Sequence, residues 1–297
     1  MTATVDILIP TYCRPTALAI TLTSVMGQTY RDVRIVISDQ TDDERSLRSL
    51  ELMAILRVLR ARGHIVEVKR HLPRRGLAEQ RQFLLDQATA PYGLFLDDDV
   101  ILEPDVIARM LRAIRHEACG FVGCAVIGLS HLNDIRPHEQ AIEFWDGPVT
   151  PETISPECSA WNRHRLHNAA NLYHVQQRLG VTAEKQRTYR IAWVGGCVLY
   201  DLAKLRQAGG FSFWPHLPSA HAGEDVLAQL QVMARFGGCG LIPSGCYHQQ
   251  LPTTVEDRRV DVPKFWPIRF LRAEAAMPFR PMPLRLESNG SSYIRAD

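Results

Sequence analysis

The stretch Tyr92-Gly93-Leu94-Phe95-Leu96-Asp97-Asp98-Asp99-Val100 is an apolar run that ends in three consecutive acids. Such a run is typical of a buried strand, and acids at the C-terminal end of a strand lie in the crevice where open α/β sheets bind ligands. Adjacent carboxylates repel one another unless a cation or a ligand offsets their charge. Hard cations such as Mg²⁺ or Mn²⁺ suit this cluster and commonly bridge to substrate phosphates. The alternative is an acidic turn that caps the next helix.

Strands and helices alternate along the chain on both sides of this stretch. Such alternation predicts a mostly parallel sheet with helices on both faces. The predicted strands are residues 5–10, 33–38, 65–71, 92–97, 121–127, 191–200 and 240–243, and the predicted helices are residues 16–27, 46–62, 77–88, 104–116 and 224–236. A polar segment at about 133–186, with a predicted helix at 164–179, interrupts the pattern. Insertions of this length beside an active edge are usually functional.

Composition limits the classes of protein to consider. The net charge of +2 gives no overall field that would indicate a nucleic-acid partner. The seven cysteines form no Cys-x-x-Cys pair, which argues against a zinc ribbon or a disulfide framework and favours a reducing compartment. We find no apolar stretch of about 18 residues that would span a membrane. The first predicted strand also leaves no room for a signal peptide. We therefore expect a cytoplasmic protein.

Five landmarks, in this order, resemble glycosyltransferase family 2, the inverting nucleotide-sugar glycosyltransferases of the GT-A fold. They are Ile9-Pro10-Thr11-Tyr12, Ser38-Asp39, Gly76-Leu77-Ala78-Glu79-Gln80-Arg81, Asp97-Asp98-Asp99 and Gly223-Glu224-Asp225. Each landmark is weak alone, and the ordered set is strong. The resemblance covers about residues 6–127 and 191–248. It implies a Rossmann-like, mostly parallel sheet and a metal-dependent enzyme that moves one sugar to an acceptor hydroxyl.

The resemblance also implies a domain organisation. A GT-A domain over residues 1–253 would contain a nucleotide-binding half (1–130), an acceptor-side insertion (about 133–190) and an acceptor-side half (191–253). Residues 254–297 would form a C-terminal extension. Its aromatic and basic residues would either contact the inner face of a membrane or pack as a helix with arginines outside. These residues are Phe265, Trp266, Arg269, Phe270 and Arg272.

The nucleotide would lie at the ends of the first two strands. By resemblance, the turn that follows the first strand lies under the base or ribose, and its contacts are Pro10, Thr11, Tyr12 and Arg14. Asp39 would accept the imide hydrogen of the base. An Asp acceptor reads a ring N–H of uracil, thymine or guanine and rejects adenine, so UDP is favoured, with GDP or dTDP as alternatives. The competing role for Asp39 is to cap the following loop. Gln40 stands where the family often has an acid or Gly, which leaves the base open.

The acid triplet would serve the diphosphate. In the family pattern Asp-any-Asp, Asp99 would hold Mn²⁺ or Mg²⁺, Asp97 would touch ribose, sugar or the metal, and Asp98 is an alternative contact. His248 would be a third metal ligand, or an ordinary loop histidine. Arg81 would face the nucleotide and pair with phosphate or with the acids, unless it is an exposed helix residue.

Asp225 is the predicted general base, because direct displacement needs a carboxylate that takes the acceptor's proton. It would open a helix whose dipole holds it ionised; alternatively, acids simply favour first helical turns. By resemblance, Gly195, Gly196 and Glu224 lie on the acceptor side. Trp193 would stack on a sugar or fill the core. The acceptor itself stays open among a glycan, a lipid-linked saccharide and a small molecule.

Three other classes compete with this interpretation. A dinucleotide-dependent oxidoreductase needs a glycine-rich turn after the first strand, and residues 10–15 contain no glycine. A sugar-nucleotidyltransferase shares the sheet and the acids, but normally opens with a glycine- and arginine-rich loop closed by lysine, which is missing here. A non-catalytic nucleotide-sugar-binding relative would be expected to lose the base or the acid cluster, and both are present.

Overall fold

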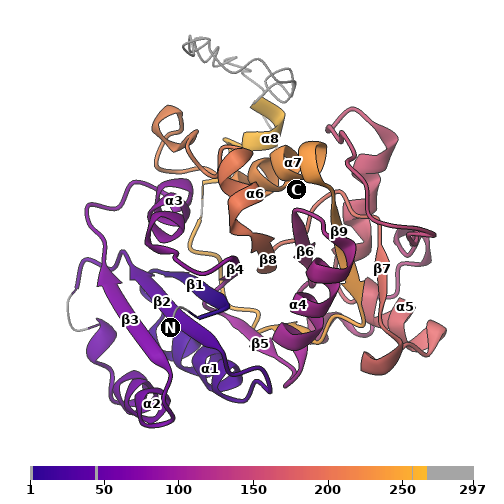
Figure 1. Cartoon of the computed structure of the whole chain (residues 1–297). Coiled ribbons are helices and arrows are strands. Elements are labelled where there is room, and N and C mark those ends of the chain that lie inside the picture. The colour runs from indigo at the N-terminus through magenta and orange to yellow at the C-terminus, as the bar shows by residue number, and fades with distance from the viewer. Residues whose placement is uncertain (1–2, 44–45, 256, 266–297) are drawn as a thin grey trace, which may run out of the picture.

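The computed structural model describes residues 3–43, 46–255 and 257–265. An eight-stranded sheet forms its centre, in the order β3-β2-β1-β4-β8-β6-β9-β7 (Figure 1). The strands are β1 (Val5–Thr11), β2 (Val33–Asp39), β3 (Ile65–Arg70), β4 (Tyr92–Leu96), β6 (Phe121–Gly123), β7 (Arg187–Tyr189), β8 (Cys197–Asp201) and β9 (Gly238–Ile242). The helices are α1 (Pro15–Met26), α2 (Leu50–Ala61), α3 (Leu77–Gln87), α4 (Val106–Glu117), α5 (Asn171–Leu179), α6 (Leu202–Gln207), α7 (Glu224–Phe236) and α8 (Val262–Phe265).

The strand directions confirm the mostly parallel sheet. β1 pairs in parallel with β2 and β4, and β2 pairs in parallel with β3. β8 runs antiparallel to both of its neighbours, β4 and β6, and β7 runs antiparallel to β9. Because the parallel strands end at one edge, the polar residues that follow β1, β2 and β4 meet there.

The helices cover both faces of the sheet, as the alternating pattern predicts. Every residue of β1 is buried, which is typical of a strand covered on two sides. Ile7 and Ile9 belong to the apolar cluster that includes residues of α1, α2 and α4. Leu8 belongs to the second cluster, with residues of α3, α6 and α7. Successive side chains point to opposite faces of a strand, so one strand anchors two layers of helices.

Several predicted boundaries are wrong. The predicted helix 46–62 is a single turn of 3₁₀ helix followed by α2, because the Ser49 hydroxyl caps α2 by accepting a hydrogen bond from the Leu52 amide. Within the predicted strand 191–200, only β8 pairs in the sheet, although Ile191 and Val194 are fully buried. Their burial in the second cluster explains the apolar run without strand pairing. The predicted helix 164–179 is a 3₁₀ helix (Ser159–His167) and then α5.

A second, two-stranded sheet was not predicted. β5 (Val100–Leu102) pairs antiparallel with β10 (Cys246–His248). The register places His248 opposite Val100, and therefore next to the acid triplet that ends at Asp99. The pairing joins segments about half the chain apart, which no local pattern reveals.

The C-terminal part of the described chain returns to the rest of the molecule. Residues that follow β10 pass the end of β1, and α8 packs against α7 (Figure 1). Among residues 3–43, 46–255 and 257–265, no helix has the length and apolar character needed to cross a bilayer. Residues 266–272, which contain most of the predicted membrane-contact side chains, lie outside the described residues.

Candidate active site

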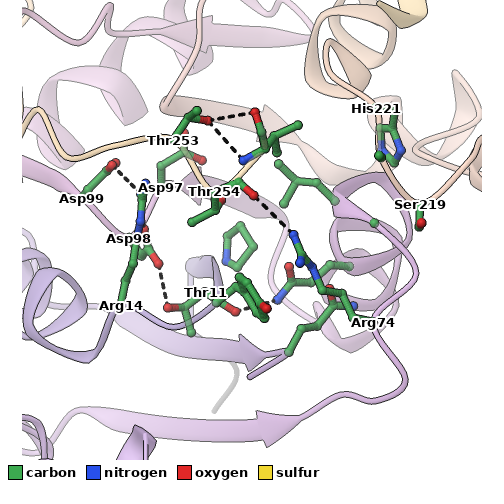
Figure 2. Close-up of a pocket in the computed structure, with 18 of the residues that line it drawn as sticks. Thr11, Arg14, Arg74, Asp97, Asp98, Asp99, Ser219, His221, Thr253 and Thr254 are labelled. Atoms are coloured by element: carbon green, nitrogen blue, oxygen red, sulfur yellow. Dashed lines mark hydrogen bonds and ion pairs between the residues drawn. The ribbon is translucent and has the colours of Figure 1, made fainter. Parts of the chain in front are cut away.

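A cavity of about 830 Å³ opens at the C-terminal ends of β1 and β4. Thr11, Arg14 and the three acids lie on one side of it, and Arg74 and His221 lie on another (Figure 2). Pro10 and Tyr12, two residues of the predicted nucleotide site, also line it. The chain after β10 closes part of the rim with Thr253 and Thr254 (Figure 2), and its Leu251 also lines the cavity. Clefts at this edge of a parallel sheet are the usual ligand sites of such folds.

The three acids of the triplet have three different nearest partners, although Arg14 also lies 3.4 Å from Asp98 Oδ1. Asp98 Oδ2 accepts a hydrogen bond from Thr11 Oγ1 at 2.6 Å, and burial raises the pKa of Asp98 to about 7. Asp99 Oδ2 lies 2.7 Å from Arg14 Nη1. Asp97 is the most exposed of the three, with 38% of its side chain accessible, and its Oδ1 lies 2.9 Å from Arg81 Nη2. Dispersing the carboxylates among three donors relieves their mutual repulsion.

His248 faces the same oxygen of Asp99, with 3.6 Å between Nε2 and Oδ2. Its other ring nitrogen, Nδ1, accepts a hydrogen bond from the Gln250 amide at 2.6 Å. A neutral imidazole that accepts at Nδ1 carries its proton on Nε2, so this proton points at Asp99. For Nε2 to bind a metal, the proton must move and the Gln250 contact must break.

The donor set near Asp99 fits a hard divalent cation in its chemistry. Carboxylate oxygens and imidazole nitrogen both suit Mn²⁺. Burial raises the pKa of Asp99, and the neighbouring Arg14 guanidinium opposes the rise. Within the described residues, no three side chains of His, Cys, Asp or Glu converge as a metal site. The protein would therefore contribute few ligands, and the phosphates of a nucleotide would supply others.

Three consecutive side chains at the start of α3 hold the ends of the strands together. Glu79 reaches His71 after β3, with 2.6 Å between Oε1 and Nε2. Gln80 Nε2 donates to the Ser38 carbonyl in β2 at 2.7 Å and to the Thr11 carbonyl in β1 at 3.3 Å. Arg81 binds Asp97 after β4. The motif was singled out from the sequence, but its fastening role was not predicted.

Arg81 also binds the first residue of α7. Its Nε donates to Glu224 Oε1 at 3.0 Å, and both side chains are about 95% buried. Arg81 therefore pairs with acids, which was one of the predicted arrangements, and it is not an exposed helix residue. Glu224, which we expected on the acceptor side, is turned into this ion pair with 4% of its side chain accessible. Its burial leaves it without a surface for an acceptor.

Two glycines separate Asp97 from Asp225. A Cβ atom on Gly196 would lie 3.6 Å from Asp97 Oδ2, and one on Gly195 would lie 3.9 Å from Asp225 Oδ2. Gly196 has a φ of +80° and packs so closely that its Cβ would lie 2.6 Å from Val126 Cγ2. Because the two glycines have no side chains, the backbone at residues 195 and 196 can pass close to Val126 and to the carboxylates of Asp97 and Asp225.

The pKa of Asp225 is higher than a helix N-terminus alone would give. Burial, with repulsion from Glu224, raises the pKa of Asp225 to about 7, and Arg81 opposes the rise. The helix dipole favours an ionised carboxylate at this terminus, but burial outweighs it. Asp225 Oδ1 accepts a hydrogen bond from the Val226 amide at 2.9 Å, which fixes the side chain at the helix terminus. Asp225 is thus poised between its two charge states near neutral pH.

Asp39 makes the loop contacts that we considered as its alternative role. Its Oδ1 accepts hydrogen bonds from the amide and the hydroxyl of Thr41, at 3.0 and 2.6 Å. Asp39 is buried, and its neighbour Gln40 lines the cavity. Tyr12 carries the Arg74 guanidinium over its ring, with 3.8 Å from Cζ to the centroid. Tyr12 was a predicted residue of the nucleotide site, whereas Arg74 was not. Together they give the cavity a flat, positively charged wall.

A smaller hollow of about 520 Å³ lies beside the main cavity and shares His248 and Leu251 with it. His131, His167 and Gln250 also line it, and His167 comes from the insertion. The neighbouring Trp193 is half-buried and stacks on His164 of the insertion, with ring centroids 5.7 Å apart and planes at 10°. The insertion therefore contributes to a second concave surface at the active edge.

His221 is a further residue of the site that the sequence did not indicate. Its Nε2 accepts a hydrogen bond from the Ala78 amide at 3.1 Å, and its Nδ1 donates to the Pro218 carbonyl at 2.7 Å. It therefore caps the first turn of α3, where Gly76 offers no side chain. No sequence pattern links residue 221 to residue 78, because the contact is tertiary.

The sequence profile described as "Glycosyl transferase family 2" matches residues 6–176. No curated protein matches the chain. Among solved structures, TarS of S. aureus (residues 1–349) in complex with UDP-GlcNAc has a TM-score of 0.54 at 14% identity, covering 84% of this chain and 60% of that one. The mannosyltransferase PcManGT from Pyrobaculum calidifontis, in complex with GDP-Man and Mn²⁺, has a TM-score of 0.52 at 16% identity, covering 86% and 59%. GalNAc-T7 with UDP, GalNAc and Mn²⁺ has a TM-score of 0.55 at 14% identity, covering 83% and 44%.

At these identities the likeness establishes a shared fold. The chain spans about half the length of these three solved chains, from 44% to 60%. The family profile is independent of that comparison and covers more than half of the chain, including the acid triplet.

Proposed function

This chain belongs to glycosyltransferase family 2, and from that premise we propose that it transfers a single hexose from a nucleoside-diphosphate sugar to an acceptor hydroxyl, with inversion and with the help of a divalent cation. One observation carries the proposal: Asp97 and Asp225 lie close to the adjacent glycines Gly196 and Gly195, and Asp97 lines the cavity at the end of β4. An in-line displacement needs such an arrangement, with leaving-group stabilisation on one side and a base on the other.

The nucleotide of the donor would occupy the 830 Å³ cavity. Tyr12 and its Arg74 partner would form a wall for the base or ribose, with Pro10 and Thr11 at the end of β1. Asp39 would read the imide hydrogen of the base with the carboxylate oxygen that Thr41 does not use. UDP is the favoured nucleotide, with GDP and dTDP as alternatives.

The diphosphate would lie at Asp99, Asp98 and Arg14. A bound Mn²⁺ or Mg²⁺ would supply positive charge that offsets the charge developing on the leaving group. Asp99 would hold it, with Asp97 nearby, and His248 would join only after its Nε2 proton has moved. Arg14 can turn from the acids to the phosphates, because guanidinium pairs well with both.

Asp225 would accept the proton of the acceptor hydroxyl as that oxygen bonds to the anomeric carbon. The bond from that carbon to the diphosphate breaks in the same step, and the configuration inverts. A carboxylate with a pKa near 7 suits this role, because a base works best when its pKa is close to the working pH. The acceptor would enter along Trp193 and the smaller hollow, so that the insertion at about 133–190 shapes the acceptor side of a domain over residues 1–253.

The proposal is tested by binding and turnover together. The melting temperature of the protein would be measured with UDP-, GDP- and dTDP-sugars, with and without Mn²⁺. The release of nucleoside diphosphate would then be followed with a mixed acceptor pool. We expect one nucleotide class to raise the melting temperature with Mn²⁺ and to be released on transfer. Binding without release would indicate a non-catalytic sugar-nucleotide binder, and release of pyrophosphate from a nucleoside triphosphate would indicate a nucleotidyltransferase.

A further inference from the structure

We propose that Arg81 is a positioning residue for the transfer reaction. Its side chain joins the end of the strand before Asp97 to the start of the helix that carries Asp225. The inference rests on the proposed function, and it assigns Arg81 a role without contact to the nucleotide. Its motif is the Gly76–Arg81 segment, whose polar side chains Glu79, Gln80 and Arg81 are all buried.

The geometry of Arg81 is that of a bridge. Nη2 lies 2.9 Å from Asp97 Oδ1, and Nε lies 3.0 Å from Glu224 Oε1. Asp97 follows β4, and Glu224 is the first residue of α7. Two nitrogens of one rigid, planar group therefore fix the separation of a strand end and a helix start. Asp225 follows Glu224 directly, so its position depends on the same contact.

The charges agree with this role. Arg81 faces three carboxylates, those of Asp97, Glu224 and Asp225. Without its positive charge, these acids would repel one another across the Gly195-Gly196 backbone, and α7 would move away from β4. Breaking a buried ion pair from one side leaves an uncompensated charge, which is strongly unfavourable.

The burial of Arg81 separates this role from nucleotide binding. Only 5% of its side chain is accessible, and the cavity for the nucleotide is lined by its neighbours Leu77 and Gln80 on the same helix. Arg14, by contrast, lines the cavity and has 15% of its side chain accessible. The two arginines therefore divide the work: Arg14 can meet the phosphates, and Arg81 holds the protein groups around them.

The test compares Arg81→Gln, Arg81→Lys and Glu224→Gln with the wild type. We would measure kcat and KM with the sugar nucleotide that gives turnover, and the Kd of its nucleoside diphosphate by calorimetry. We expect kcat of Arg81→Gln to fall about 10²-fold, as a small misplacement of reacting groups can cause. The Kd and the donor KM should change by no more than about twofold. Arg81→Lys, which keeps the charge but not the fork, should recover part of kcat.

Arg34→Gln is the matched control. Arg34 is also a doubly paired arginine, partly buried with 13% of its side chain accessible, with Nη2 2.8 Å from Asp6 Oδ2 and Nη1 2.9 Å from Glu67 Oε1. It lies at the opposite end of β1 from Thr11, where Asp6 stands. Its loss should lower the melting temperature and leave kcat per folded molecule unchanged. If Arg81→Gln does not fold, Glu224→Gln carries the same comparison, because it weakens the bridge from the helix side.

Two results would overturn the inference and leave the proposed function standing. A Kd for the nucleoside diphosphate that rises as much as kcat falls would mean that Arg81 binds the nucleotide. A kcat that stays unchanged in both Arg81→Gln and Glu224→Gln would mean that the contacts of Arg81 do not determine the position of Asp225. Absence of turnover in the wild type with every sugar nucleotide would reject the proposed function itself, and this inference with it.

Discussion

Arg14 and Asp99 form an ion pair in which Nη1 lies 2.7 Å from Oδ2, and His248 Nε2 faces the same oxygen at 3.6 Å. Two positive or proton-donating groups thus occupy the side of Asp99 on which a cation would bind. Arg14 also donates to the Pro252 carbonyl, so the chain after β10 is tied to the same point. The protein's own groups therefore offset part of the negative charge at Asp99.

Replacing Arg14 should change metal and nucleotide binding in opposite directions. In Arg14→Gln, Asp98 and Asp99 lose a competing cation, so Mn²⁺ should bind about 10-fold more tightly in the absence of nucleotide. The same variant should bind UDP, or the nucleoside diphosphate that the panel selects, more weakly when Mn²⁺ is absent, because a phosphate partner is lost. Electron paramagnetic resonance of free Mn²⁺ and calorimetry measure the two affinities.

Arg74→Gln is the control for this prediction, because Arg74 lines the same cavity but stacks on Tyr12 and does not contact the acids. It should leave the Mn²⁺ affinity unchanged. Weaker Mn²⁺ binding in Arg14→Gln would show that Arg14 supports the cation and does not compete with it.

Transfer should depend on pH through the charge of Asp225. The pKa of this acid is raised to about 7 from an ordinary value of 3.8, so it is protonated below neutral pH and ionised above it. A base must be ionised to take a proton, and the rate should therefore rise with pH through about 7. Asp225→Asn should lower kcat by about 10²- to 10⁴-fold, the usual contribution of a general base. A pH profile of kcat for the wild type, and single-turnover assays for the variant, measure both effects.

Asp225→Asn should still bind the nucleoside diphosphate as the wild type does, which separates a lost base from a lost site. Turnover at the wild-type rate in this variant would remove Asp225 from the mechanism.

The two glycines between Asp97 and Asp225 should respond differently to alanine. At Gly196, φ is +80° and the new Cβ would lie 2.6 Å from Val126 Cγ2, so Gly196→Ala should lower the free energy of unfolding by about 1–3 kcal/mol. At Gly195 the nearest atoms to a new Cβ are 3.9 and 4.0 Å away, belonging to Asp225 and Trp193, so the fold should tolerate alanine. Chemical denaturation measures the stability of both variants.

Gly195→Ala should instead affect transfer, because its methyl group would lie between Asp225, the predicted base, and Trp193, where we expect the acceptor to bind. A fall in kcat without a fall in stability would agree with this placement. Equal transfer by Gly195→Ala and the wild type would move the acceptor elsewhere.

Asp39 should matter for the affinity and the choice of nucleotide. Asp39→Asn keeps an acceptor oxygen for Thr41 but replaces the carboxylate that would meet the imide hydrogen, so UDP affinity should fall about 10-fold, as the loss of one charge-assisted hydrogen bond predicts. Thr41→Val removes the hydroxyl partner of Asp39 and leaves its charge, and it should weaken UDP binding less. Calorimetry with UDP and GDP compares the variants; equal affinities in Asp39→Asn and the wild type would leave Asp39 as a loop cap.

The sequence predicted what depends on local pattern. The strand that ends at Leu96, the acids that follow it and the helix at residues 224–236 all follow from apolar periodicity and from composition at the ends of elements. The shared edge of the parallel strands then placed Thr11 and the acid triplet together. Order along the chain was enough for these.

What depends on distant pairing was not predictable. Arg81 and Glu224 are 143 residues apart, and nothing in either segment selects the other over the phosphates or the acceptor. The reversal of β8, the β5–β10 pairing and the proton position on His248 follow from tertiary contacts in the same way. The raised pKa of Asp225 was not predicted, because the helix dipole can be inferred from sequence, whereas burial cannot.

His248 and Leu251 each form part of the wall of both hollows. A molecule bound in the larger hollow would therefore contact two residues that also shape the smaller one. This shared wall predicts an ordered mechanism. In steady-state kinetics, the sugar nucleotide should bind first and the acceptor second.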